Sequence, residues 1–430
     1  MRRKLRKPQG LRRPIRLRPA LRAAVLILAT LGRAKAGVLS DDGLQVSTWV
    51  NYFSSDRSLD NRTGVYGTGA DLLWHRRLDE GWRLHAHGRW AYPTTGSASP
   101  VGRVLSAYAE RRTASDAWRI GTQTVAWGQA DGVNPTDNLT PSDYTVLRPA
   151  TADQRFGIPA ILWHHYLSRR YTWTTFITPY FSPSVLPLPA TAGVPVVQCV
   201  PSTRLAHTET AFKLSRSGDS ADWSLSYFRG FDLLPDVRLA STVAPEVLLH
   251  YDAMTVWGAD IDIPYGRFVF WAETGYVHPT AFQHSADPAP LTPALATVLG
   301  VSHALGRATL RVQMIERHVF HYNDPVYWNG TLAQALALDN ALINGETHRD
   351  NSGVTAEVMD HWMHSRLQGH VFIYLSFRPN SRYTRLFLSY AVSDHLQALL
   401  GADLYEGPSN SEFCQLKPNQ GWFLEGRYNL

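Results

Sequence analysis

The feature that most constrains the fold of this chain is the alternation of apolar and polar side chains at every second position. It is clearest between residues 82 and 90, where Trp82, Leu84 and Trp90 alternate with arginines and histidines. Successive side chains of a β-strand point to opposite faces of the sheet, so such a segment has one apolar and one polar face. A helix would scatter both classes around its circumference. The pattern therefore predicts strands with one face toward lipid and the other toward water.

The same alternation recurs along the chain in segments of about nine to twelve residues, the length of a tilted strand that crosses a bilayer. Short connections alternate with long ones, except for the short gap at 378–381. The predicted strands lie near 44–53, 64–75, 81–91, 101–112, 117–127, 157–167, 171–181, 204–215, 222–232, 254–263, 266–276, 294–304, 308–319, 352–362, 367–377, 382–392, 395–404 and 421–430.

These segments predict an all-β protein, an antiparallel transmembrane β-barrel of about eighteen strands, in the range of about 16–18. Closure is required because lipid cannot satisfy an open sheet edge. Short turns are expected in the periplasm, together with both termini, and long loops outside the cell. The alternative is a water-soluble β-sandwich or propeller. Tryptophans near predicted strand ends suggest an interfacial girdle: Trp74, Trp82, Trp90, Trp118, Trp127, Trp163 and Trp422.

The net charge of +6 comes from the first 36 residues. They hold twelve of the 42 lysines and arginines and no acid, which leaves 30 bases against 36 acids in the remainder. Nucleic-acid binding is therefore not expected. The basic stretch precedes an apolar run, Ala23–Leu31, and the small residues Ala34 and Ala36. We expect residues 1–36 to be a secretory signal peptide and residues 37–430 to form one barrel domain in the outer membrane of a Gram-negative bacterium.

Several other classes of protein are not expected. Two cysteines, Cys199 and Cys414, are too few for a disulfide scaffold or a cysteine-rich zinc module. Signatures of hydrolases, zinc proteases and phosphate-binding loops are missing, so we predict no enzyme activity, no cofactor and no metal. The spacing of His361 and His364 occurs in metal sites, but the pair falls at a predicted turn.

Two segments carry a resemblance to a known family. The stretch from Gly121 to Tyr144, with Trp127-Gly128 and Asn134-Pro135, resembles the Trp-Gly-x-x-Asp and Asn-Pro-x-Asp signature of porin-like Gram-negative outer-membrane β-barrels. Gly401–Pro408 and the closing strand are similar to that group as well. More distantly, the chain is similar to barrels of the alginate-export type. Such chains usually end in Phe, whereas this one ends in Leu430.

The polar faces of the strands supply the predicted pore lining. If the tryptophans face lipid, arginines and histidines of residues 83–89 form a basic wall, and acids of residues 260–273 form an acidic wall across the barrel. Opposed charges in a pore order water and bias passage by charge. The alternative is that these charges pair with one another and only hold the barrel's shape. The pore-lining candidates are Arg83, His85, His87, Arg89, Arg119, Asp260, Asp262, Glu273 and Arg311.

The long connection at 128–156 is predicted to fold inward and narrow the pore, because a connection of this length is rarely idle. Its Asn-Pro and Asp-Asn pairs also suit tight turns, which is the alternative. By composition, Thr331–Ile343 is predicted to form a short helix in another long loop. The constriction candidates are Asp131, Asp137, Asp143, Arg148 and Arg155.

The predicted function is passage of small hydrophilic solutes, anionic or sugar-like ones in particular. The expected preference for anions follows because lumen bases outnumber lumen acids. Alternatives are a polysaccharide exporter, a hydrolase with catalytic side chains on the rim, and a closed barrel that acts as an adhesin or assembly partner. The predicted partners are the lipid bilayer, the barrel-assembly machinery, the transported solutes and, as an open alternative, further copies of the chain.

Overall fold

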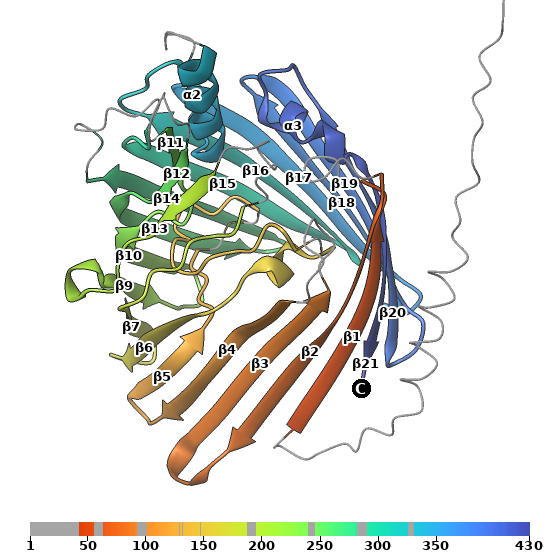
Figure 1. Cartoon of the computed structure of the whole chain (residues 1–430). Helices are drawn as coiled ribbons and strands as arrows, with labels where there is room; N and C mark the ends of the chain where they lie inside the picture. Colours follow the sequence, from red (N-terminus) through yellow and green to blue (C-terminus); the bar gives the residue numbers. More distant parts are fainter. Residues whose placement is uncertain are drawn as a thin grey trace, which may run out of the picture. The chain divides into compact units, whose positions relative to one another are not determined.

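The computed structural model describes residues 43–55, 63–92, 101–128, 130, 132–146, 148–186, 195–239, 246–280, 282, 290–325 and 331–430. The expected signal peptide lies outside this part of the chain. The main body is a closed ring of eighteen antiparallel strands (Figure 1). Closure is made by the first and last strands, in which Ser47 to Phe53 pair with Asn429 to Phe423. The ring of described strands therefore has no free edge strand, as a lipid environment requires.

The strands of the ring follow chain order, with each strand paired to its neighbours. They are β1 (Gly43–Phe53), β2 (Val65–Arg77), β3 (Trp82–Tyr92), β4 (Val101–Arg112), β5 (Asp116–Gln123), β6 (Ile158–Tyr166), β7 (Tyr171–Thr178), β9 (Glu209–Arg216), β10 (Asp222–Phe231), β13 (Ala253–Tyr265), β14 (Phe268–Pro279), β15 (Ala294–Leu305), β16 (Ala308–Val319), β17 (Asp350–Trp362), β18 (Leu367–Phe377), β19 (Asn380–Ala391), β20 (Leu396–Glu406) and β21 (Gly421–Asn429).

All eighteen predicted strands are present, and the differences lie at their ends. β5 ends at Gln123 rather than near 127, because the chain turns into the barrel there. β7 ends at Thr178, directly before Pro179, which has no N–H to donate to a neighbouring strand. β2 is longer than predicted and continues to Arg77. That extension adds Arg77 to the wall of the barrel.

The outer face of the ring is an apolar band. Large hydrophobic side chains on alternate strand positions are exposed, as expected where lipid rather than protein covers them. The exposed strand residues include Leu44, Leu72, Trp74, Trp90, Trp118, Ile120, Leu225, Trp257, Ile263, Leu299, Met314, Val371, Leu386, Leu388, Leu400 and Trp422. Trp127 is a correction to the predicted girdle: it is buried inside the barrel and belongs to no lipid-facing strand.

The two ends of the ring differ. At the short-turn end, brief turns such as 78–81 and 266–267 join consecutive strands. At the long-loop end, the connections are long, except that only Arg378 and Pro379 separate β18 from β19. Across this short connection β18 and β19 pair as an antiparallel hairpin with an unbroken register. The alternation predicted from the sequence therefore holds, with this one exception.

Three long loops fold together into a small cap. It contains β8 (Val196–Cys199), β11 (Asp236–Leu239), β12 (Val247–His250) and the predicted helix, now α2 (Thr331–Ile343). The side chain of Asn340 in α2 accepts from the N–H of Val237 at 2.6 Å and donates to its C=O at 3.0 Å. An apolar cluster of Val237, Leu249 and Leu336 holds the same elements together. A fourth loop carries α3 (Glu412–Gln415).

Candidate functional site: the lumen and its internal loop

The connection between β5 and β6, residues 124–157, is called the internal loop below, and its described residues (124–128, 130, 132–146 and 148–157) lie inside the ring. One side of it is held by Glu273 of β14, whose carboxylate accepts from the N–H groups of Ala130 and Thr136, each at 3.0 Å. The hydroxyl of Thr136 donates to the same carboxylate at 2.8 Å. Glu273 is only 1% exposed. Glu273, one of the predicted pore-lining residues, therefore anchors the internal loop to the barrel wall.

The other side of the loop reaches strands across the ring. Asp153 lies 3.0 Å from Arg148 in the loop and 3.2 Å from Arg427 of β21. Arg89 of β3 donates to the C=O of Asp153. Since β14 lies far from β3 and β21 in the strand order, a loop that binds all three must cross the lumen. Figure 1 shows this segment, in light orange, within the ring of strands.

Arg148 is an almost fully enclosed charge of this network. Its side chain is 1% exposed, lies 3.4 Å from the fully buried Glu425, and covers the ring of Trp49 at 4.1 Å. Burial lowers the pKa of Arg148, and the carboxylates of Glu425 and Asp153 oppose that shift. Burial also disfavours the charge on Asp153, but the guanidinium of Arg148, with those of Arg427 and Arg89, holds its pKa below the usual value. Arg148 and Asp153 of the loop therefore belong to one cluster in which opposite charges offset each other.

An apolar core also fixes the loop to the wall. Val125, Trp127 and Leu139 of the loop are buried against inward-facing residues of β6 to β14. Burial of a large hydrophobic side chain contributes roughly 1.5–3 kcal/mol. Trp127 thus stabilises the loop instead of an interface with lipid headgroups. Its ring also lies 5.8 Å from the ammonium of Lys213.

The remaining constriction candidates pair within the loop or with the wall. Arg155 binds Asp137, and its guanidinium also donates to the C=O of Thr140. Asp143 accepts from Arg103 of β4 at 2.6 Å. Asp131 lies outside the described residues. The structure therefore brings together Asp137 with Arg155 and Arg148 with the barrel wall, and the role of these residues in narrowing a pore is a proposal.

Arg103 was not among the predicted lumen residues because a β-bulge reverses the facing of its strand. The pairing of β3 with β4 shifts between His87 and Gly88, which leaves Leu105 as the extra residue. A bulge redirects the side chains that follow it. Val104 is consequently 56% exposed on the outer face, and Arg103 points inward. Simple alternation through residues 101–112 gives no signal of this change.

The predicted acidic wall is present on adjacent strands. Asp260 of β13 and Glu273 of β14 are directly opposite in the register, and Asp262 follows on the same face of β13. Asp260 accepts from the hydroxyl of Ser224 and lies 3.6 Å from the ammonium of Lys213. Two of the three acids therefore already have partners: Asp260 contacts Ser224 and Lys213, and Glu273 anchors the internal loop.

The predicted basic wall divides into two groups. His87 and Arg89 lie near Asp71, with the Nε of Arg89 2.6 Å from its carboxylate. Arg83 and His85 lie closer to the short-turn end. Arg311, on another part of the ring, pairs with Glu357 of β17 at 2.7 Å. Structural pairing therefore accounts for part of this wall, as the alternative interpretation held.

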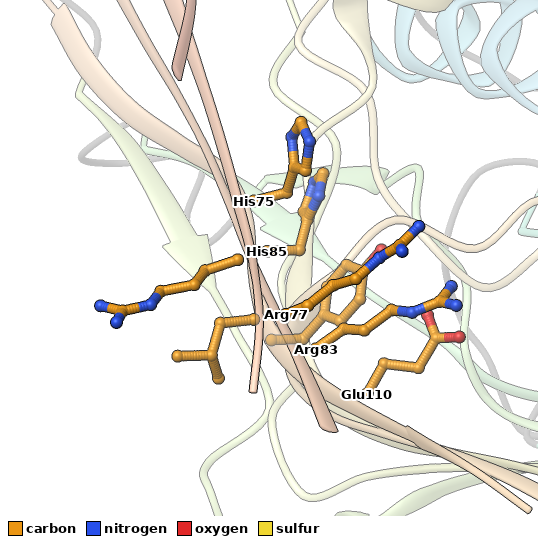
Figure 2. A pocket seen from close by; sticks show the side chains of 8 residues that line it. His75, Arg77, Arg83, His85 and Glu110 are labelled. Carbon is orange, nitrogen blue, oxygen red and sulfur yellow. The ribbon is translucent and has the colours of Figure 1, made fainter. Parts of the chain in front are cut away.

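Near the short-turn end, a cavity of about 250 Å³ opens beside β2, β3 and β4. Figure 2 shows His75, Arg77, Arg83, His85 and Glu110 around it. Arg119 of β5 donates to Glu110 at 3.1 Å and lies over the ring of Tyr108 at 5.3 Å. His75 and Arg77 were not predicted as site residues; the predicted strand ended at His75 and placed Arg77 in a turn. This cavity is called the basic pocket below.

Two searches of the described residues complete the survey. They contain no group of three or more His, Cys, Asp or Glu side chains arranged to hold a metal ion. Over the same part of the chain, every helix is too short or too polar to serve as a membrane span.

The backbone resembles solved structures of Gram-negative outer-membrane porins. OccD3 (OpdP) of Pseudomonas aeruginosa has 10% identity and a TM-score of 0.54, with 92% of each chain covered. OccK5 (OpdH) of the same species has 9% identity and a TM-score of 0.53, and OccAB2 of Acinetobacter baumannii has 11% and 0.55. Each of these two comparisons covers 92% of this chain and 99% of the other.

At this level of identity the likeness concerns the fold. The described part of the chain shares their fold, an eighteen-stranded antiparallel β-barrel. No family model and no curated protein matches the sequence. The more distant resemblance to barrels of the alginate-export type stays a prediction.

Proposed function

We propose that this chain forms a channel in the outer membrane through which small hydrophilic solutes pass. The observation that carries the proposal is the division of the ring into an apolar outer face and a charged inner face around an internal loop. A polar, water-filled interior narrowed by a loop is the design of a diffusion channel. The porin fold supports the same function.

A preference for anions is the finer part of the proposal. The inward-facing acids are largely engaged: Glu273 by the internal loop, Asp260 by Ser224, and Glu425 by Arg148 and Arg427. The basic pocket, in contrast, has more arginines than carboxylates. Fixed positive charge that lines a pore raises the local concentration of anions. We expect anionic or sugar-like solutes to pass more readily than cations of the same size.

Reversal potentials in planar bilayers test this directly. Across a roughly tenfold gradient of potassium chloride, we expect a reversal potential whose sign shows that chloride is more permeant than potassium. Swelling of liposomes with sugars of graded size would give the width of the pore. A clear cation preference would reject the finer proposal, and no conductance at all would reject the channel.

One observation favours a second candidate function. The internal loop is tied to both sides of the ring, and a cap of three loops packs at one end. A closed barrel that serves as an adhesin or assembly partner would share these features. Absence of conductance, together with exclusion of all sugars from liposomes, would favour that function. Polysaccharide export and hydrolysis at the rim are further predictions, tested by export of polymer and by assays on esters and lipids.

A further inference from the structure

We propose that two copies of this chain pair in the membrane through the outer face of β10, β13, β14, β15 and β16. These five strands are consecutive in the ring (Figure 1). The interface is isologous: the same surface of each copy faces the other across a two-fold axis normal to the membrane. Such pairing does not depend on conduction, so the inference goes beyond the proposed channel.

A row of polar side chains crosses this face beside exposed apolar ones. Thr274, Thr297, Glu316 and Ser352 are direct register partners on β14 to β17. They belong to the outer face, because Met314, two positions before Glu316 on β16, is 51% exposed there. The hydroxyls of Thr274 and Thr297 bond to each other at 3.0 Å. Lipid chains offer no hydrogen-bond partner to the carboxylate of Glu316.

Two opposite charges lie at the two sides of this face. Glu316 is three residues before the end of β16 at Val319, and Arg229 is two residues before the end of β10 at Phe231, both at the long-loop end. Arg229 is exposed and shares the outer face with Leu225, four positions earlier. Among the described residues, neither charged side chain has a hydrogen bond or an ion pair. The face therefore presents one unpaired acid and one unpaired base.

The strands that carry and separate these charges enclose a hollow. A cavity of about 510 Å³ opens where the small side chains of Ala259, Ala272 and Thr274 lie among larger ones. Leu225 lines the same cavity and is 54% exposed. Small side chains let two membrane-embedded surfaces approach closely. Since a two-fold axis repeats both features, Leu225 of each copy can enter the hollow of the other.

A second copy supplies what this face lacks. An axis over β14, the middle strand of the five, places Arg229 of each copy opposite Glu316 of the other, so one operation pairs all four charges. Opposite charges attract more strongly in lipid than in water. An acyl chain would fill the hollow but leave the carboxylate without a partner. An anionic lipid headgroup would pair with Arg229 but repel Glu316.

Native mass spectrometry of the detergent-purified protein, with light scattering on the same samples, tests the pairing. We expect a dimer of the parent. The charge reversals Arg229→Glu and Glu316→Arg should each raise the dissociation constant of the dimer by about tenfold or more, because each places like charges in both contacts. An equimolar mixture of the two variants should again form dimers, with one copy of each, since every contact then joins opposite charges.

The control is Arg111→Glu, which reverses a charge on the outer face of β4 at the short-turn end. Arg111 is exposed and is the register partner of the outward-facing Trp118. This variant should leave the dimer unchanged. Migration on unboiled gels shows which variants fold, and Arg229→Gln or Glu316→Gln, which remove a charge without reversing it, replace any reversal that does not.

Three results would overturn the proposal. A monomeric or trimeric parent would do so, and a monomer would leave lipid as the cover of this face. Dimers of parental affinity in either reversal variant would show that the two charges do not meet. Absence of dimers in the mixture of folded variants would exclude the pairing of Arg229 with Glu316.

Discussion

At the scale of single residues, the lumen is organised by buried charges that each require a partner. Arg148 and Glu425 are almost fully inaccessible to solvent, and removal of either leaves the other with incomplete compensation. Isolated charges are far more costly inside a protein than at its surface. Inward-facing charge in this barrel is therefore structural as well as functional.

Substitution of Arg148 by methionine should be strongly destabilising. Breaking a buried ion pair costs about 3–5 kcal/mol, and we expect the lower end of that range because Arg427 still pairs with Glu425. Thermal unfolding followed on unboiled gels would measure the change. The double variant Arg148→Met/Glu425→Gln should recover part of the loss. A barrel as stable as the parent after Arg148→Met would contradict this account.

Glu273→Gln tests the anchor of the internal loop. The carboxylate accepts two backbone N–H groups and one hydroxyl, whereas an amide offers one oxygen and brings an NH₂ toward donors. A buried donor without its acceptor costs about 1–3 kcal/mol. We expect a looser loop, seen as greater current noise and a larger single-channel conductance. The control Asp262→Asn removes a charge from the neighbouring strand without touching the loop, so it should leave the current noise unchanged. Equal noise in the two variants would argue against the anchor.

At the scale of elements, the alternation of side chains predicted strands well and predicted contacts between distant segments poorly. The helix at Thr331–Ile343 is confirmed, but nothing in its composition indicates that Asn340 would bind the backbone of Val237. Likewise, β5 ended early because its continuation enters the barrel interior, where Trp127 finds apolar neighbours. Tertiary packing overrode the local pattern there.

The cap should become less stable as the pH rises toward 8. Burial, together with the charge of Asp252, raises the pKa of Asp236 to about 8, so the folded cap favours its protonated form. Stability from a raised pKa is complete below the unfolded value and is lost as the pH passes through the folded value. Burial also raises the pKa of Asp232 to about 6. The stability that its protonated form contributes is therefore lost as the pH rises through about 6, before that of Asp236. The pKa of Asp252 is lowered and its contribution is lost only in acid.

Limited proteolysis of the loop 232–252 between about pH 7 and 8.5 would measure this dependence. Cleavage should accelerate with pH in the parent and change much less in Asp236→Asn, which mimics the protonated acid. The same slope in both proteins would show that another group controls the cap.

At the scale of the whole molecule, the closed ring and its apolar exterior make the barrel a single cooperative unit in lipid or detergent. The purified protein should therefore require detergent for solubility and should migrate faster on SDS gels before boiling than after it. The physical reason is that closure leaves no strand edge at which SDS could begin unfolding without breaking a complete ladder of hydrogen bonds. Identical migration before and after boiling, or solubility without detergent, would contradict a transmembrane barrel.

The alternation along the chain was enough to predict the strands, a number of about eighteen and, for most of them, the apolar outer face. These properties follow from a local rule, the two-residue period of a strand, that any short segment satisfies on its own. Which charges meet depends on how distant segments pack together. Asp153 and Arg427 lie 274 positions apart and come together because the ring closes and the internal loop crosses it. A local period carries no information about such pairs, nor about the bulge that turns Arg103 inward.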